Sequence, residues 1–508
     1  MKINKNSSSI KAGAVISYVA IFLNIAISFL YTPWMIKKIG VSDYGLYSLI
    51  ISFISYFIMD FGLSSAIQRF IAKYRAEGNE DGVAKMVGLT TRVYLIIDTV
   101  IFLVLFILYF FIANIFTGLT PEEIDRLKGL YIIAGCFSVL TFLFKPMAGA
   151  MMAYEYFVEE RVLEMVNKVG VVLLICVALV LGADVYALVL INGAVSLVTS
   201  ILKFLVFRYK SKLKIQWSFF DKAELKSIFS FSMWTFGSGL AQRMRLSLIP
   251  SILGIISNSQ EIACFALGMS LEGMVFTFSN GINGLFLPKV SRMSYMQKRD
   301  DILNLMIQIG RIQLFIFCLI FSGFIIFGSS FLNLWVGEDF SSVYYVVVFL
   351  ITSNVLSLTQ TIANDLVFVE NRVRDTASRI LVTSIAGLAV ACLLARNYGA
   401  VGCAIGTGVG MCLYLMWINI YYYKQMGIDV LSFFRSCHLI ILPILCILCI
   451  ISYFIISLFT LNSWFKLVIF VGIYFIVYVL VCYLLLFNTE EKKLMKFGIR
   501  FRLSKMKE

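Results

Sequence analysis

The chain has 508 residues, of which 60% are hydrophobic and only 14% are charged, and its mean hydropathy is +0.91. A soluble protein of this composition could not cover its surface with polar groups, so the soluble classes are excluded. The formal net charge of +14 would suit nucleic acid, but the basic residues lie between long apolar stretches, and we expect no nucleic-acid partner.

Fourteen apolar stretches run from one end of the chain to the other. About 20 apolar residues cross a bilayer as a helix, and backbone groups in hydrocarbon must bond within their own segment. The sequence therefore predicts an all-α polytopic membrane protein. The predicted spans are 12–36, 43–67, 88–113, 130–153, 165–182, 185–207, 228–255, 261–287, 305–327, 341–365, 377–395, 400–423, 437–459 and 465–487.

The basic residues are distributed unequally between the two sides of the membrane. With the N-terminus inside, the predicted cytoplasmic segments carry 32 Lys and Arg residues and the outer loops carry 6. This bias follows the positive-inside rule and predicts that both termini are cytoplasmic. The first apolar stretch is too long for a cleaved signal, so we interpret it as a permanent span. The basic loops are expected to contact anionic lipids.

Several short motifs recur at a nearly constant offset. Gly40 and Gly254 are 214 residues apart, and Gly182-Ala183 recurs 217 residues later as Gly399-Ala400. A repeat of six spans is even, so both copies would enter the membrane in the same orientation, related by a pseudo-two-fold axis along the membrane normal. Chance similarity between long membrane proteins is the alternative explanation. The predicted parts are an N-lobe of spans 1–6 (1–210), a C-lobe of spans 7–12 (211–424), and two additional spans with a basic tail (425–508).

The loops leave little room for enzymatic domains. The chain contains no phosphate-binding P-loop, and the glycine-rich run 406–410 lies within span 12, where small residues allow close helix packing. None of the eleven cysteines has zinc-ligand spacing, and we predict no metal site. The single histidine, His438, is expected at the cytoplasmic interface of span 13. We therefore predict that the protein is not an enzyme.

Charged residues at membrane depth are the strongest candidates for function. Each costs roughly 2.5–3.5 kcal/mol on insertion scales, so such residues usually face a cavity or a partner. The candidate substrate-binding cations are Arg243, Arg245, Lys145, Arg311 and Arg69, of which Arg69 lies nearer the cytoplasmic end of its span. The candidate acids are Asp60, Asp98 and Glu272, which could bind a coupling ion or act as counter-ions.

Arg243 and Arg245 lie near the middle of span 7 and point about 200° apart on a helix. A guanidinium group matches the oxygen geometry of phosphate, which favours a phosphate-binding surface. Internal ion pairs, for example with Glu272, are the alternative. Lys145 precedes Pro146, and a proline in a span frees a carbonyl and often marks a lined cavity.

Two regions resemble a known family. The motifs are Tyr31-Thr32-Pro33-Trp34, Gly40-Val41-Ser42-Asp43-Tyr44-Gly45-Leu46-Tyr47, Asp60-Phe61-Gly62-Leu63, Gln68-Arg69-Phe70-Ile71-Ala72-Lys73-Tyr74 and, near span 12, Tyr398-Gly399-Ala400-Val401-Gly402-Cys403-Ala404-Ile405-Gly406-Thr407. They resemble the polysaccharide transport family, the Wzx-type O-antigen and capsule repeat-unit flippases of the multidrug/oligosaccharidyl-lipid/polysaccharide exporter superfamily.

The resemblance implies two six-helix lobes around a central cavity. The implied substrate is an undecaprenyl-pyrophosphate-linked oligosaccharide, moved from the inner to the outer leaflet of the bacterial inner membrane. Alternating access would be driven by an H⁺ or Na⁺ gradient, without another cofactor. A polysaccharide polymerase and a chain-length regulator are candidate partners of an expected monomer. The alternatives are a multidrug and toxin extruder of the same superfamily, a lipid II flippase and a lipid-linked sugar polymerase.

Overall fold

The computed structural model describes residues 28–213, 216, 221–280, 286–489 and 491–492. Within these residues the secondary structure is helical and contains no strand. Nine of the described helical segments are long and apolar enough to cross a membrane. The all-α membrane fold is therefore confirmed. The count of fourteen spans stays a prediction, and most of the first predicted span lies outside the described residues.

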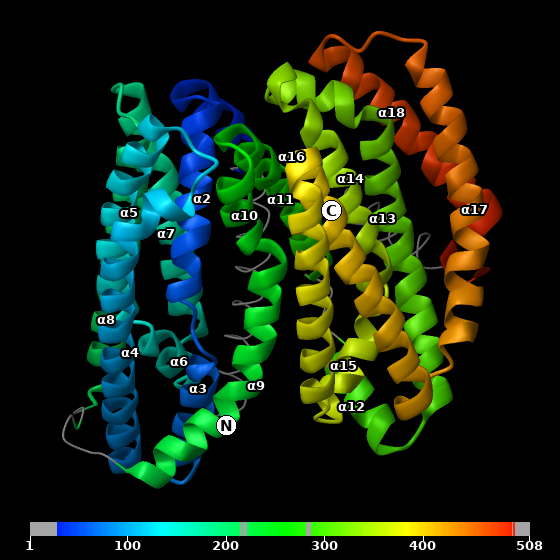
Figure 1. The fold of residues 1–508 in the computed structure, drawn as a ribbon. Coiled ribbons are helices and arrows are strands. Elements are labelled where there is room, and N and C mark those ends of the chain that lie inside the picture. The colour runs from blue at the N-terminus through cyan, green and yellow to red at the C-terminus, as the bar shows by residue number, and fades with distance from the viewer. Residues whose placement is uncertain (1–27, 214–215, 217–220, 281–285, 490, 493–508) are drawn as a thin grey trace, which may run out of the picture. The chain divides into compact units, whose positions relative to one another are not determined.

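The chain divides into two compact units (Figure 1). Unit 1 comprises Met1–Gly281 with Val373–Tyr414, and unit 2 comprises Ile282–Arg372 with Leu415–Glu508. The lobe boundaries at 210 and 424 stay predictions. We use "first repeat" for 1–210 and "second repeat" for 211–424.

Unit 1 is built from ten numbered helices and the first part of an eleventh, and residues 28–39 precede them as a further helical segment. They are α2 (Val41–Phe57), α3 (Leu63–Ala76), α4 (Glu80–Ile115), α5 (Pro121–Phe142), α6 (Pro146–Ala153), α7 (Phe157–Val180), α8 (Val185–Ser211), α9 (Lys222–Leu246), α10 (Leu248–Ile256), α11 (Ser259–Asn280) and part of α16 (Val373–Met426).

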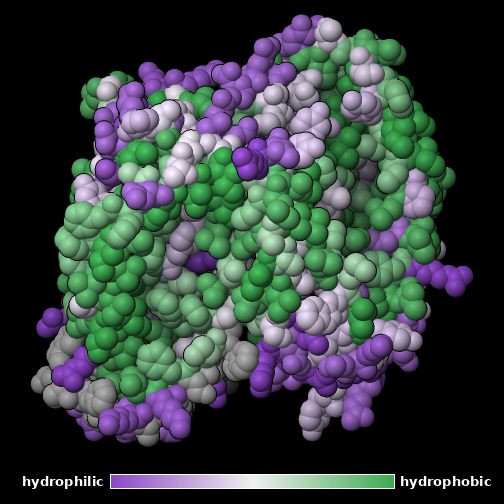
Figure 2. Space-filling view, viewed as in Figure 1, coloured by the Kyte–Doolittle hydropathy of each residue, from purple (hydrophilic) through white to green (hydrophobic). Residues whose placement is uncertain are grey.

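The long helices expose apolar side chains along their middle lengths. On α4, Leu103, Phe106 and Phe110 are 52%, 56% and 64% exposed. On the face that Figure 2 shows, hydrophobic side chains cover the middle of the helices and hydrophilic side chains gather at the helix ends. Such a surface would be unfavourable in water and matches the hydrocarbon layer of a bilayer.

Helix starts are fixed by local sequence signals. Thr120 and Glu123 form a reciprocal capping box at the start of α5, and Pro121 occupies the first helical position. The side chains of Asn79 and Asp184 cap α4 and α8 in the same way, each by accepting a backbone N–H. These side chains satisfy N–H groups that have no partner within the helix.

Unit 2 contains the remaining helices. They are α12 (Leu287–Tyr295), α13 (Arg299–Trp335), η1 (Glu338–Phe340), α14 (Ser341–Leu358), α15 (Thr361–Val369), the end of α16, α17 (Val430–Ser457), α18 (Trp464–Val481) and η2 (Cys482–Leu486). The core of the unit is α13, which packs against α14, α17 and α18.

A buried arginine attaches the end of the described chain to α13. Arg311 is 6% exposed. Its Nε and Nη2 atoms donate to the Glu491 carboxylate at 2.7 and 3.1 Å, and further bonds reach the carbonyls of Leu486 and Ser436. The fork geometry of guanidinium suits such a multidentate contact.

The helix bounds of the two repeats correspond. Helix α6 ends at Ala153 and α15 ends at Val369, an offset of 216. Two residues after the end of each helix, the backbone enters the left-handed region, with φ of 62° at Glu155 and 54° at Asn371. The N–H of each of these residues donates at 3.1 Å to a carbonyl three residues earlier, Met152 or Phe368. The same turn is therefore built twice.

Helix α16 folds back on itself at Gly399, whose φ of 50° and ψ of −130° interrupt the helix. Glycines at 402, 406 and 410 lie four residues apart and allow the two arms to approach closely. A Cβ on Gly406 would lie 2.3 Å from the backbone nitrogen of Ala391, and one on Gly410 would lie 2.8 Å from the carbonyl oxygen of Thr383. The packing role predicted for this run is confirmed.

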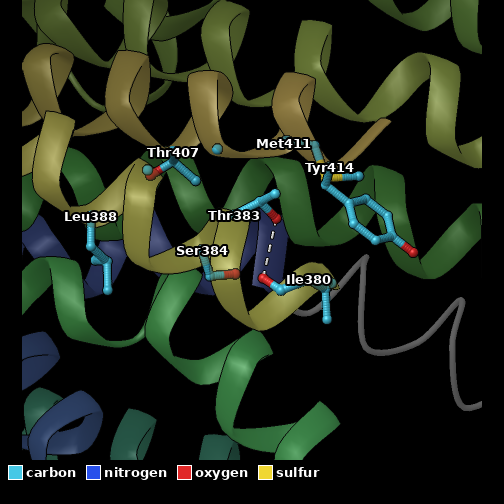
Figure 3. A pocket seen from close by; sticks show the side chains of 9 residues that line it. Ile380, Thr383, Ser384, Leu388, Thr407, Met411 and Tyr414 are labelled. Carbon is cyan, nitrogen blue, oxygen red and sulfur yellow. Dashed lines mark hydrogen bonds between the residues drawn. The ribbon is translucent and has the colours of Figure 1, made fainter. Parts of the chain in front are cut away.

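A small pocket lies on this hairpin, within unit 1 (Figure 3). Polar side chains at its wall include Thr383, Ser384 and Thr407, and Tyr414 lies at one end. The Thr383 hydroxyl donates to the carbonyl of Ile380 at 3.2 Å. Because the helix backbone already uses this hydroxyl, the pocket is a by-product of close packing in our interpretation.

We predict that Gly406→Leu destabilises the protein, because the new side chain must displace the backbone of the facing arm. Overpacking of this kind costs about 1–3 kcal/mol or more. The matched control is Gly472→Leu on α18, where a Cβ meets nothing within 4 Å. Melting temperature in detergent should fall for the first variant and stay near the wild-type value for the second. Equal melting temperatures would contradict the packing role.

We also predict that Arg311→Ala is strongly destabilising, because it leaves Glu491 buried without its charge partner. Breaking a buried ion pair costs about 3–5 kcal/mol. The control is Arg161→Ala, which removes the exposed 2.8 Å pair with Glu164 and should cost less than about 1 kcal/mol. Thermal unfolding in detergent measures both, and the prediction fails if the two variants lose the same stability.

Candidate functional site

Three interrupted helices of unit 1 lie close together. The first break separates α2 from α3 at residues 58–62, where Phe61 and Gly62 have φ of 48° and 73°. The second separates α5 from α6 at residues 143–145, and the third separates α9 from α10 at Ser247. Helix α3 packs against α6 and α9, and α10 packs against α2. Breaks at membrane depth expose backbone polar groups, which is tolerated where they are buried or line a cavity.

Lys145 connects the first two breaks. It precedes α6, is half-buried, and its Nζ donates to the carbonyl of Ile58, which ends α2. The C-terminal end of a helix carries partial negative charge, so an ammonium group is favoured there. Lys145 also lies within electrostatic range of Asp60 and Arg243.

Asp60 is held in place by three donors. Its carboxylate accepts the Ser64 N–H at 3.1 Å, the Ser64 hydroxyl at 2.7 Å and the Tyr94 hydroxyl at 2.6 Å. Tyr94 is fully buried on α4. Asp60 is therefore fixed in place within electrostatic range of Lys145, and its role as a counter-ion or as an ion-binding group stays a prediction.

Arg243 lies in the last turn of α9, next to the third break. Its guanidinium is half-buried and lies within electrostatic range of Tyr56 and Lys145. The Tyr56 hydroxyl in turn bonds the carbonyl of Ser247 and lies 3.1 Å from the Ser251 hydroxyl. Arg245 belongs to the same helix, but its side chain lies outside the described residues.

We call Asp60, Lys145 and Arg243, with Tyr56 and Tyr94, the helix-break cluster. It contains two cations and one carboxylate, so its formal charge is positive. All five side chains belong to unit 1 and are buried or half-buried. A Lys ammonium carries three donors and an Arg guanidinium five, which suits a ligand with several anionic oxygens.

The other two predicted acids, Asp98 and Glu272, are both buried in unit 1. Asp98 is 5% exposed on α4, and its Oδ1 has no hydrogen-bond partner among the described residues. Glu272 is buried on α11. In the described part of the chain, no group of three or more His, Cys, Asp or Glu side chains is placed to hold a metal ion.

Two predicted cations lie elsewhere. Arg311 belongs to unit 2 and is taken up by Glu491 and two carbonyls, so we leave it out of the proposed site. Arg69 is exposed in the middle of α3.

The single histidine, His438, is buried within the protein. Its side chain is only 4% exposed, and Nε2 lies 3.2 Å from the Thr359 hydroxyl in the break between α14 and α15. The rings of Phe433 and Phe434 cover it, with centroids 5.3 and 4.9 Å from the imidazole centroid. The aromatic rings and the neighbouring helix break shield the imidazole from solvent, and its place at the cytoplasmic interface stays a prediction.

The sequence interpretation missed Tyr56, Ser64 and Tyr94, which position the charged members of the cluster. A weak signal existed for Tyr94, because it precedes Asp98 by one helical turn on the same face of α4. Tyr56 carries no comparable signal, since its partners Ser247 and Ser251 are more than 190 residues away.

Comparison with known sequences identifies a family. The family of polysaccharide biosynthesis proteins matches residues 10–294, which is more than half of the chain. Comparison with curated protein sequences gives no significant match.

Solved structures with the same fold include flippases and exporters. The lipid II flippase MurJ in an inward closed conformation aligns with TM-score 0.69 and 12% identity, covering 92% of this chain and 97% of that one. An inward-facing multidrug resistance MATE family transporter of the MOP superfamily gives 0.65 and 11%, covering 82% and 99%. The eukaryotic MATE transporter AtDTX14 gives 0.59 and 14%, covering 89% and 98%. The chain therefore belongs to the polysaccharide biosynthesis protein family and is a multi-pass membrane protein with the fold of MOP-superfamily transporters.

Proposed function

We propose that this protein is a flippase that moves an undecaprenyl-pyrophosphate-linked oligosaccharide repeat unit from the inner to the outer leaflet of a bacterial inner membrane. The product would enter the synthesis of a surface polysaccharide such as O-antigen, capsule or exopolysaccharide. Family membership supports a transporter in polysaccharide synthesis. The observation that carries the choice of substrate is the positive helix-break cluster within a membrane-spanning unit.

The chemistry of the substrate fits that cluster. A pyrophosphate cannot cross hydrocarbon unaided, because an unpaired anion there is prohibitively costly. Lys145 and Arg243 would replace the water and counter-ions of the phosphates, and Asp60 lies within electrostatic range of Lys145. The prenyl tail can remain in the lipid. Membrane lipids, a polymerase and a chain-length regulator are the proposed partners of a monomeric protein.

An ion gradient is the proposed energy source for alternating access. Asp98 is the best candidate for the coupling group, because a buried carboxylate oxygen without a hydrogen-bond donor is stabilised by a proton or Na⁺. Asp60 is less suited, since three donors already hold it. Glu272 remains a further candidate.

A multidrug and toxin extruder of the same superfamily is the main alternative. Such a protein would export cationic amphiphiles and should present an acidic cavity. The two cations of the helix-break cluster against one carboxylate favour an anionic substrate. A lipid II flippase shares the pyrophosphate chemistry, and a sugar polymerase would form product without transport. Export of a cationic dye, flipping of lipid II and product formation by the purified protein distinguish these alternatives.

We predict that Lys145→Ala and Arg243→Ala each lower flipping of a fluorescent polyprenyl-pyrophosphate oligosaccharide in proteoliposomes by at least tenfold. Arg243→Lys should recover only part of the activity, because an ammonium group lacks the planar fork. Arg208→Ala, which removes an exposed cation near the end of α8, is the matched control and should retain wild-type flipping.

The variants must reach the membrane in normal amount, because loss of Lys145 also leaves the Ile58 carbonyl without its donor. Arg245→Ala is included, since its side chain is a predicted site residue. If Lys145→Ala, Arg243→Ala and Arg245→Ala are all well expressed and complement a flippase-null strain, the cationic site is disproved.

The predicted topology has a separate test. The 32 to 6 split of basic residues predicts that a reporter fused after Lys226 lies in the cytoplasm and one fused near Thr120 lies outside. Alkaline phosphatase activity should appear only at the second position, and green fluorescent protein should fluoresce only at the first. The reverse pattern at either position would overturn the topology and the proposed direction of transport.

A further inference from the structure

The carboxylate of Glu123 gathers donors from three segments of the chain. Its Oε2 accepts the Thr120 N–H at 2.9 Å and the Thr120 hydroxyl at 3.2 Å. Its Oε1 accepts the Ser42 hydroxyl at 2.7 Å and the Ser259 hydroxyl at 2.5 Å. The three segments are the starts of α2, α5 and α11, all within unit 1.

The two serines are related by the internal repeat. They are 217 residues apart, and their Oγ atoms are separated by 3.1 Å. Ser42 lies in the first turn of α2 and Ser259 begins α11. Glu123 therefore binds the same residue type at corresponding positions of the first and the second repeat. The distribution of basic residues predicts that all three segments lie on the outer side of the membrane.

The backbones around this joint are in close contact. A Cβ on Gly45 would lie 2.1 Å from the carbonyl oxygen of Ser259. The Gly118 N–H donates to the carbonyl of Gly254 at 3.2 Å, and the Thr117 hydroxyl donates to that of Ile255 at 3.0 Å. The outer ends of first-repeat helices thus lie directly on the outer ends of α10 and α11.

We propose that Glu123, Ser42 and Ser259 form an outer latch that opens and closes once in each transport cycle. This inference rests on the proposed function. A hydrogen bond to a carboxylate is about twice as strong as one between neutral groups, so these bonds stabilise the closed latch. The Gly118 and Thr117 bonds also cross between the repeats, but among the bonds of Glu123 only the one from Ser259 does. When it breaks, Thr120 and Ser42 still satisfy the carboxylate, so the latch can open without leaving a buried charge unpartnered.

A joint of the same chemistry lies at the opposite predicted side. The Tyr74 hydroxyl of α3 donates to the Glu224 carboxylate of α9 at 2.5 Å. That carboxylate raises the pKa of Tyr74 to about 12, so the hydroxyl remains protonated at neutral pH and donates. Hydroxyl-to-carboxylate bonds thus join the first and second repeats at two places, near the start of α9 and just after the end of α10.

The test traps the latch with a disulfide. Ser42→Cys and Ser259→Cys are introduced together after the eleven native cysteines are replaced. The present Oγ–Oγ separation is within reach of a disulfide after small side-chain rotations. Oxidation should cross-link the protein and lower flipping at least tenfold, and reduction should restore it. A cross-linked protein with unchanged flipping overturns the latch, and so does the absence of cross-linking.

Controls separate the latch from general effects. The Asn167→Cys/Ser196→Cys pair joins α7 to α8 within the first repeat, where the native side chains are 3.5 Å apart, and its oxidation should leave flipping unchanged. The single-cysteine variants should resist oxidation. If the wild-type protein shows no flipping, the proposed function fails, and the latch is then judged by labelling alone.

The labelling experiment needs no substrate. Glu123→Ala should increase the reaction of a membrane-impermeant maleimide with Ser251→Cys, whose native side chain is 7% exposed on α10. Glu122→Ala removes a neighbouring carboxylate that is 80% exposed and should leave labelling unchanged. Equal labelling in the two variants, added from the outer side, overturns the latch.

Discussion

Every backbone N–H and C=O group in hydrocarbon needs a partner, and a helix supplies one only while it continues. Where α2, α5 and α9 stop, side chains must take over. The Lys145 ammonium donates to the carbonyl of Ile58 at the end of α2, and the Tyr56 hydroxyl donates to the carbonyl of Ser247 between α9 and α10. The polar groups of unit 1 gather at these breaks because the breaks require them.

Because the same side chains satisfy the backbone and form the proposed site, they affect both stability and the proposed transport. Lys145 satisfies a backbone carbonyl and also adds positive charge near Asp60 and Arg243. A variant at such a position changes the fold and the site together, so expression and transport must be read side by side. The guanidinium of Arg311, by contrast, is bound by Glu491 and two backbone carbonyls of unit 2.

The fold class could be predicted from the sequence because apolar length and loop charge follow directly from the thickness and the electrostatics of a bilayer. The break at Lys145 could also be predicted, since Pro146 marks it. Contacts between segments far apart in the sequence could not be predicted. Arg311 meets Glu491 180 residues away, and His438 meets Thr359 across 79 residues. Such contacts depend on which helices pack together, and hydropathy alone leaves that choice open.

The same turn follows α6 and α15, but the residues that precede these two helices differ in charge. The residues that precede these two helices, Lys145 and Gln360, occupy corresponding positions 215 residues apart. One is a cation that reaches the end of α2, and the other is a neutral amide that donates to Asn419 at 2.8 Å. A negatively charged ligand would therefore find a cation at the start of α6 and only a neutral amide at the start of α15.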